Sequence, residues 1–294
     1  MGVNSENGDE RFLALICFVA SLGGVLFGFD TAVISGTFSF VESYFLLNKI
    51  QVGWFTSSAL VGAIAGAAIA GTLSDKYGRK PILMFAAILF FVSAFGSAIP
   101  INFIVLICAR LVGGFGVGMV SVLAPMYISE VAPPKIRGRL VALYQLSIVI
   151  GILLAYFSNW ILLEISKESP EIFEGTGFMH KIINAEVWRA MFGSEMLPSG
   201  LFILLLFLIP ESPRWLIKNG YSQKGYTVLS RISGLAVAKN ELNQIHQTGP
   251  QINGKVKELF KPGLRLALIV GFGLSVFGQF TGVNIIVYYG PTIL

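Results

Sequence analysis

Charged residues are scarce in this chain of 294 residues. Only 13% of the residues are Asp, Glu, Lys or Arg, whereas 54% are hydrophobic. Soluble domains carry about twice that share of charge, so this chain has too little polar surface to coat a water-soluble globule. The composition therefore excludes a large cytosolic enzyme, a disordered chain and a nucleic-acid binder. It predicts an all-α integral membrane protein.

Residues that build disulfides, metal sites and catalytic centres are also few. Cys17 and Cys108 lie inside apolar runs, and His180 and His246 lie in predicted loops. We expect both cysteines to be buried thiols, since two of them build no disulfide framework. No spacing of a nucleophile with a base, or of metal ligands, appears, so we expect no enzyme and no cofactor. No Asn-x-Ser/Thr acceptor occurs, which slightly favours a bacterial cell (inner) membrane over a glycosylated surface.

Long apolar runs, by contrast, are frequent. A helix needs about 20 mostly apolar residues to cross a bilayer. Seven segments meet this requirement: 12–36, 51–72, 81–99, 103–125, 138–162, 188–209 and 264–290. Close helix packing is expected on small-residue faces, with glycines four or so residues apart. Those glycines are Gly62, Gly66 and Gly71 in the second span and Gly114 and Gly118 in the fourth.

A polar stretch at 210–263 interrupts this pattern. It carries weak amphipathic helix signals around Gln223–Ile232 and Ala236–His246. We interpret it as a linker with short surface helices; a disordered loop is the alternative.

Lysine and arginine are distributed unequally between the loops. Sixteen fall on the side of the N-terminus and four on the other. The positive-inside rule therefore places the N-terminus in the cytoplasm. Trp54, Trp160 and Trp188 fall at outer span ends, where we expect an aromatic belt.

Two charges stand inside apolar spans. Asp30 lies in FGFDTAVISG in the first span and Arg110 in CARLVGGFGVG in the fourth. A charge at the bilayer centre costs about 2.5–3.5 kcal/mol on insertion scales, so such residues face a cavity or pair. Counting residues places both about 10 Å below the outer surface, on antiparallel helices. We expect them to pair, either as a structural ion pair or as a titrating functional pair.

Acids and bases also gather at three cytoplasmic span ends. We expect Asp75 to cap a helix N-terminus, and the bases to pair with acids in a latch that makes and breaks. A solvated charged turn is the alternative. The set comprises Asp75, Arg79, Lys80, Glu130, Arg137, Glu211 and Arg214.

Three neutral amides lie in apolar spans: Gln145, Gln279 and Asn284. Amides both donate and accept hydrogen bonds without carrying charge, which suits a polyol better than an ion. Hydrogen bonding between helices is the alternative role. Aromatic residues that could stack on a sugar ring, or simply fill the bundle, are Phe27, Tyr288 and Tyr289.

Five motifs then carry a resemblance to a known family. They are FGFDTAVISG, GTLSDKYGRKP, PMYISEVAPPKIRGRLVALYQLSIVIGILLAY, PESPRWL and QFTGVNIIVYYGP, in this order over nearly the whole chain. The chain closely resembles the sugar porter family of the major facilitator superfamily, in particular its bacterial proton-linked pentose and hexose symporters.

The resemblance implies two six-helix bundles joined by a cytoplasmic linker, with the sugar between them and access alternating as the halves rock. On this basis 1–11 is a cytoplasmic N-terminus, 12–209 the first bundle and 210–263 the linker. Residues 264–294 would open a second bundle that is absent here. The resemblance further implies that the three amides contact sugar hydroxyls, that Asp30 with Arg110 is the protonation pair, and that the charged set is the latch.

Three positions depart from the family pattern. Gly278 replaces the first of two consecutive glutamines, and Ile152 replaces a second glutamine of the fifth span. Both leave the identity of the sugar open, whereas Lys76 in place of an arginine changes little. The implied function is proton:monosaccharide symport in a lipid bilayer. A facilitative uniporter, which has no use for a protonatable Asp30, and a transport-dead sugar sensor are the alternatives.

Overall fold

The described part of the chain is helical. The computed structural model describes residues 8–168, 182, 185–247, 263–283 and 285–288, and these contain no β-strand. Five long helices come first: α1 (Glu10–Phe45), α2 (Lys49–Tyr77), α3 (Arg79–Ala98), α4 (Phe103–Val131) and α5 (Arg137–Glu168). A sixth crossing follows as two helices, α7 (Val187–Ser194) and α8 (Met196–Leu206). The seventh begins with α12 (Leu264–Phe280) and runs on to Tyr288. The first six predicted spans are therefore confirmed, although α1 continues past residue 36 to Phe45. The seventh, predicted over 264–290, is confirmed up to Tyr288, and residues 284, 289 and 290 lie outside the described residues.

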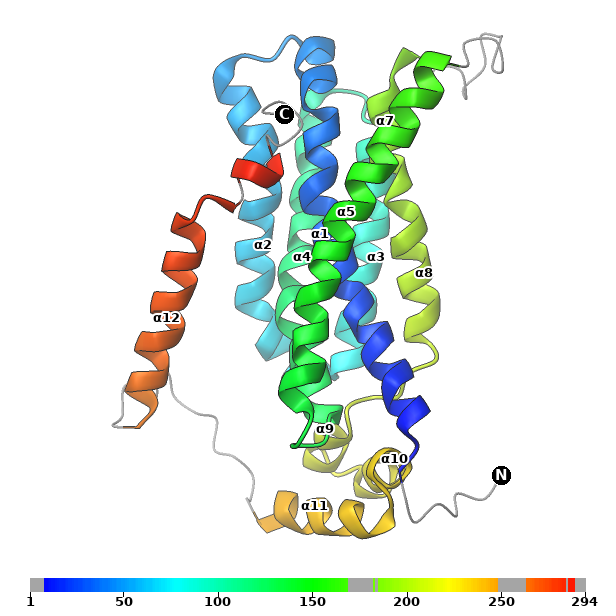
Figure 1. Cartoon of the computed structure of the whole chain (residues 1–294), viewed down its shortest axis with the longest axis vertical. Helices are drawn as coiled ribbons and strands as arrows, with labels where there is room; N and C mark the ends of the chain where they lie inside the picture. The colour runs from blue at the N-terminus through cyan, green and yellow to red at the C-terminus, as the bar shows by residue number, and fades with distance from the viewer. Residues whose placement is uncertain (1–7, 169–181, 183–184, 248–262, 284, 289–294) are drawn as a thin grey trace.

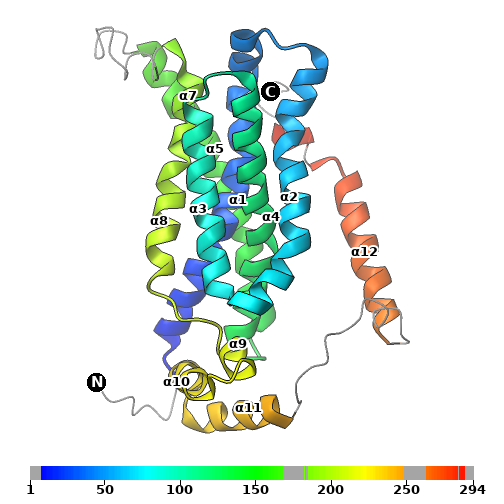
Figure 2. The ribbon, with the colours of Figure 1, turned by 180° about the vertical axis from the view of Figure 1, so that it is seen from behind.

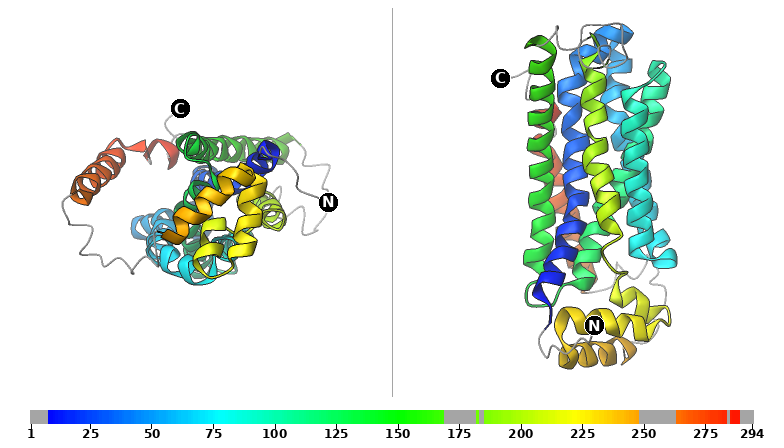
Figure 3. Two further views of the ribbon diagram at one scale, coloured as in Figure 1. Left: turned by 90° about the horizontal axis from the view of Figure 1, so that it is seen from below. Right: turned by 90° about the vertical axis from the view of Figure 1, so that its right-hand side faces the viewer.

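The first six crossings stand side by side as one bundle, and α12 stands apart from it (Figure 1). Three short helices lie across one end of the bundle: α9 (Pro213–Lys218), α10 (Ser222–Ser233) and α11 (Leu235–Gln247). We call this end, which also holds the start of α1, the linker end, and the opposite end the far end. Figure 2 shows the same arrangement from behind, and Figure 3 shows α10 and α11 crossing beneath the bundle.

Glycine contacts bring α2 and α4 together. A Cβ atom at Gly62 would lie 2.2 Å from the carbonyl oxygen of Leu111, and one at Gly114 would lie 2.0 Å from that of Ala59. Larger residues would push these backbones apart, as expected for small-residue faces. The prediction was wrong for Gly71, where an added Cβ would have no neighbour within 4 Å.

Among the described residues, the buried apolar side chains of the bundle form two clusters. The cluster at the linker end includes Leu83, Phe90 and Tyr127, and the far cluster includes Phe29, Phe192 and Trp188. Trp188, only 2% exposed, belongs to the far cluster, where its ring lies 5.4 Å from that of Tyr44. Its predicted place in an aromatic belt was therefore wrong, whereas Trp54 and Trp160 are exposed. Cys108 also differs from expectation, because it is exposed.

The linker helices are attached to the bundle. Ile232 of α10 is 4% exposed and packs into the cluster at the linker end. The guanidinium of Arg231 lies 3.6 Å from the ring centroid of Phe12, and the Arg231 carbonyl accepts the backbone N–H of Asp9 at 2.8 Å. The predicted surface helices are thus confirmed, and the disordered-loop alternative was wrong for α9 to α11; residues 248–262 of this stretch lie outside the described residues.

Candidate functional site

Asp30 and Arg110 form a buried pair inside the bundle, as predicted. Arg110 Nη1 donates to Asp30 Oδ1 at 2.5 Å, and its Nη2 donates to the Asp30 carbonyl at 3.4 Å. The two residues are only 2% and 1% exposed. Gly113 helps to make room, because a Cβ there would lie 2.2 Å from Ser93 Oγ and 3.8 Å from Asp30 Oδ1. Helices α1 and α4 thus hold a buried ion pair shielded from solvent.

A second acid faces this pair. Glu195, at the junction of α7 and α8, is 1% exposed, and its Oε1 has no hydrogen-bond partner among the residues that the structure describes. It lies close enough to Asp30 and Arg110 to interact with both electrostatically. The sequence prediction missed Glu195, although the rule that singled out Asp30, a charge inside an apolar span, applies to it equally. The site therefore holds a second buried carboxyl group within electrostatic range of the Asp30–Arg110 pair, although the ion pair of Arg110 is with Asp30.

An aromatic ring faces the same guanidinium. Arg110 Cζ lies 5.6 Å from the ring centroid of Phe192, which is fully buried in α7. Phe55 of α2 meets that ring edge-on, with centroids 6.3 Å apart. Arg110 Nε, in contrast, has no hydrogen-bond partner.

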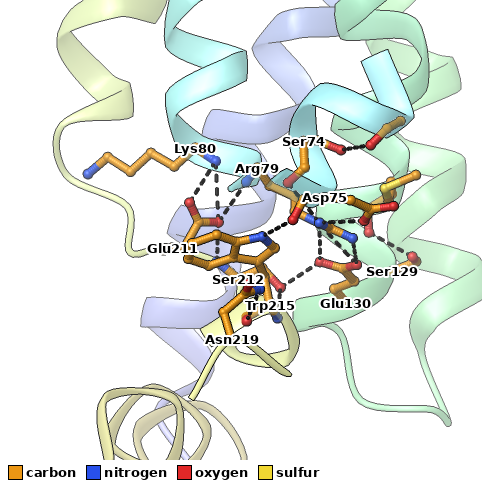
Figure 4. A network of polar contacts seen from close by, with 12 residues as sticks. Ser74, Asp75, Arg79, Lys80, Ser129, Glu130, Glu211, Ser212, Trp215 and Asn219 are labelled. Atoms are coloured by element: carbon orange, nitrogen blue, oxygen red, sulfur yellow. Dashed lines mark hydrogen bonds and ion pairs between the residues drawn. The ribbon is translucent and has the colours of Figure 1, made fainter. Parts of the chain in front are cut away.

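A charged network occupies the linker end (Figure 4). Arg79, at the start of α3, donates from Nη2 to Glu130 Oε1 at 2.8 Å and pairs through Nη1 with Asp75 at 2.9 Å. Ser212 Oγ donates to the other oxygen of Glu130 at 2.5 Å. This network joins α2, α3, α4 and the start of the linker, and it confirms the predicted pairing of Arg79 with an acid.

Glu211 caps the N-terminus of α3. Its carboxylate accepts the backbone N–H of Arg79 at 3.0 Å and that of Lys80 at 3.2 Å. The predicted cap by Asp75 was wrong, because Gly78 occupies the cap position at φ 104° and offers no side chain. Lys80 Nζ in turn donates to the carbonyl of Ile209 at 2.7 Å. Burial raises the pKa of Glu211, while backbone N–H groups and the charge of Arg79 oppose this rise.

Two predicted members stay outside the network. Arg137 reaches only the carbonyl of Ala132, at 3.5 Å, and its Nε is buried without a partner. Arg214 is exposed and forms no ion pair with any described residue. The prediction also missed Trp215, whose indole N–H donates to the Asp75 carbonyl at 2.9 Å. That bond ties α9 to the end of α2.

The predicted amides lie on two exposed helix faces. Gln145 is exposed on α5, and Gln279 is exposed near the end of α12. Asn284 and Tyr289 lie outside the described residues. Phe27 is half-buried against the cluster at the linker end.

The seventh crossing contacts the far cluster of the bundle beyond α12. No residue in the most apolar part of this crossing is buried. Gly282, at φ 76°, separates α12 from a short turn of helix that reaches Tyr288. There the carbonyl of Val287 accepts the hydroxyl of Tyr156 at 2.8 Å. Tyr288 packs against the far cluster, close enough to Asp30 to interact with it electrostatically.

Comparison with known proteins gives consistent matches over almost the whole chain. A family model described as "Sugar (and other) transporter" matches residues 16–294. The chain is 43% identical over 283 residues to an arabinose-proton symporter of Bacillus subtilis, covering 96% of this chain and 58% of that protein. It is 36% identical over 314 residues to a D-xylose-proton symporter of Escherichia coli, covering 97% and 61%. The chain thus spans about three fifths of the length of these relatives.

Solved structures match as well. A proton:xylose symporter of the major facilitator superfamily, bound to 6-bromo-6-deoxy-D-glucose, superposes with a TM-score of 0.80 at 34% identity, over 97% of this chain and 63% of that one. A partially occluded, inward-open xylose transporter of E. coli gives a TM-score of 0.78 at 35% identity, over 96% and 67%.

Proposed function

The chain belongs to the sugar transporter family, and from this we propose that it provides the first bundle of a transporter that carries one monosaccharide together with a proton. The chain is a multi-pass membrane protein with the major facilitator fold. We infer that a second bundle completes the sugar site, as in two-bundle transporters generally. The bundle boundaries 12–209, 210–263 and 264–294 belong to the same proposal.

The observation that carries the proposal is the buried cluster of Asp30, Arg110 and Glu195. An arginine keeps its proton at any workable pH, so only the two carboxyl groups can exchange one. Protonating Asp30 removes the charge that holds Arg110, and this loosens the contact between α1 and α4. A proton can therefore change how two helices of the bundle are held, which is what coupling to movement of the bundle requires.

For the sugar we propose the amides Gln145, Gln279 and Asn284. Gln145 and Gln279 are exposed on α5 and α12, where a second bundle and a ligand could reach them. Neutral amides match sugar hydroxyls as both donors and acceptors. We assign stacking on the sugar ring to Phe27, Tyr288 and Tyr289.

The network at the linker end fits the role of a latch. Arg79, Glu130 and Glu211 join three bundle helices to the linker through bonds that water could replace when the end opens. We place this end, with the N-terminus, in the cytoplasm of a bacterial cell because sixteen lysines and arginines lie on its side.

Paired transport assays test the proposal. The protein assayed is the proposed two-bundle transporter, in which the second bundle follows this chain in the same polypeptide. It is purified and reconstituted into vesicles. We expect exchange of labelled sugar between equal pools, and accumulation when a pH gradient is imposed. Exchange without accumulation would identify a uniporter, and binding without either would identify a sensor. The 294-residue chain alone should exchange no sugar, because it would lack the second bundle that we propose completes the sugar site.

A further inference from the structure

We propose that Phe192 is a positioning residue of the proton site: its ring face supports the Arg110 guanidinium during the interval in which Asp30 is protonated. This inference rests on the proposed proton coupling and adds a group that does not itself titrate.

Arg110 depends heavily on one residue. Both of its hydrogen bonds among the described residues go to Asp30, one to the carboxylate and one to the backbone carbonyl. Its Nε has no hydrogen-bond partner in the described part of the chain, and the residue is only 1% exposed, so bulk solvent does not reach the guanidinium. Once Asp30 takes up a proton, a buried cation is left without its counter-charge, which is a costly state.

Phe192 is placed to reduce that cost. The guanidinium carbon lies 5.6 Å from its ring centroid, within the range of about 6 Å over which a ring face attracts a cation. The ring is fully buried, and such attraction is stronger where water is absent. Phe55, edge-on to the ring at an interplanar angle of 86°, fixes its orientation.

Four groups with charge or a titratable proton face this point: Asp30 from α1, Arg110 from α4, Glu195 from the junction of α7 and α8, and Tyr288 from beyond α12. Glu195 is the other possible support for the cation, but its Oε1 has no hydrogen-bond partner. A carboxylate supports the cation only when it is ionised, whereas a ring face is present at every pH. The Phe192 ring stabilises the Arg110 cation most when Asp30 is neutral and no longer does so. The ring therefore stabilises the protonated state of the site and favours proton uptake by Asp30.

Infrared titration of the 294-residue chain in lipid vesicles tests this without any sugar. The C=O band of protonated Asp30 is identified by its absence in Asp30→Asn, and its intensity is followed against pH. In Phe192→Leu the midpoint should move toward acid by about 0.5 to 1 pH unit. Fluorinated phenylalanines at position 192 keep the shape but weaken the ring face, so they should shift the midpoint in the same direction, more with each fluorine. Both shifts should persist in a Glu195→Gln background.

Phe90→Leu is the matched control, because Phe90 is equally buried but lies in the other cluster. Its midpoint should equal that of the wild type. An unchanged midpoint in the fluorinated series overturns the inference, and so does a shift that disappears in Glu195→Gln. If the Asp30 band of the wild type does not titrate at all, proton coupling fails as well. If the Asp30 band titrates with the same midpoint in the wild type and in the Phe192 variants, only the role of Phe192 is excluded and proton coupling by Asp30 stands.

Discussion

Glu211 caps the helix that begins with Arg79, accepting its backbone N–H at 3.0 Å across 132 residues of sequence. The first N–H groups of a helix have no partner within it, and they attract negative charge. Gly78 offers no side chain for this purpose, and the carboxylate of Glu211 occupies the space where one would lie, 2.3 Å from a Cβ built on Gly78. The start of α3 is thus completed by the residue that opens the linker.

This burial predicts a pH dependence. The pKa of Glu211 is raised above its ordinary 4.5 by burial, so the folded chain binds this proton more tightly than the unfolded chain. Its contribution to stability is therefore full below pH 4.5 and is lost as the pH rises through the raised pKa. We measure the free energy of unfolding in detergent as a function of pH. As the pH increases above 4.5, the wild type should lose stability relative to Glu211→Gln, which has no carboxyl group to ionise.

Glu164→Gln provides the control for this experiment, because Glu164 is a half-buried acid whose ion pair among the described residues is with the exposed Lys167. The difference in free energy of unfolding between Glu164→Gln and the wild type should not change with pH over the same pH range. If Glu211→Gln also runs parallel to the wild type, burial does not control this carboxyl group.

Breaking the Arg79–Glu130 pair should destabilise the bundle. Arg79 is 7% exposed, so Glu130→Gln leaves a largely buried guanidinium with only the exposed Asp75 as acid partner. We expect the free energy of unfolding to fall by about 3 kcal/mol, as for other broken buried pairs. Chemical denaturation of the purified chain measures this.

Arg214→Gln is the comparison for that variant. Arg214 is exposed and makes no ion pair within the described part of the chain, so its loss should change stability by less than about 0.5 kcal/mol. Equal effects of the two substitutions would mean that the network contributes no more than an ordinary surface charge.

The amides predict losses of sugar affinity. In the protein extended by its second bundle, Gln145→Ala, Gln279→Ala and Asn284→Ala should each weaken sugar binding by about 1–3 kcal/mol, because each leaves a sugar hydroxyl without its partner. Titration calorimetry on folded variants measures this. Unchanged affinity in all three would assign them to helix packing and place the site elsewhere.

The sequence predicted correctly those features that follow from counting residues along a helix, namely the length of a span and the depth of a residue within it. The seven spans follow from apolar length, and the meeting of Asp30 with Arg110 follows from equal depth on antiparallel helices. Depth does not say which way a side chain faces, so Trp188 was expected in the aromatic belt although its side chain is buried in the bundle. Nor does a charge near a span end reveal its partner, which is why we expected Arg137 and Arg214, at the starts of α5 and α9, in a network that they do not join in this structure. Glu195 was within reach of the same argument as Asp30.

The last prediction decides between coupled and facilitated transport. Asp30→Asn carries no charge, so it resembles protonated Asp30 at every pH and cannot release a proton. Sugar should still bind and exchange between equal pools, because an amide leaves Arg110 as loosely held as the protonated acid does. Accumulation driven by a pH gradient should be lost, because no proton moves with the sugar. Counterflow and gradient-driven uptake, measured on the same vesicles, separate the two activities.

Glu42→Gln controls for the loss of a carboxylate on the same helix, since Glu42 is exposed on α1 and should retain both activities. If Asp30→Asn still concentrates sugar under the gradient, the buried pair with Arg110 only holds α1 to α4, and the coupling proton binds elsewhere, with Glu195 the next acid to test. If the wild type also ignores the gradient while exchanging sugar, the buried carboxylates do not couple and the protein is a uniporter. Only loss of accumulation together with retained exchange assigns the proton to Asp30, because misfolding would abolish both.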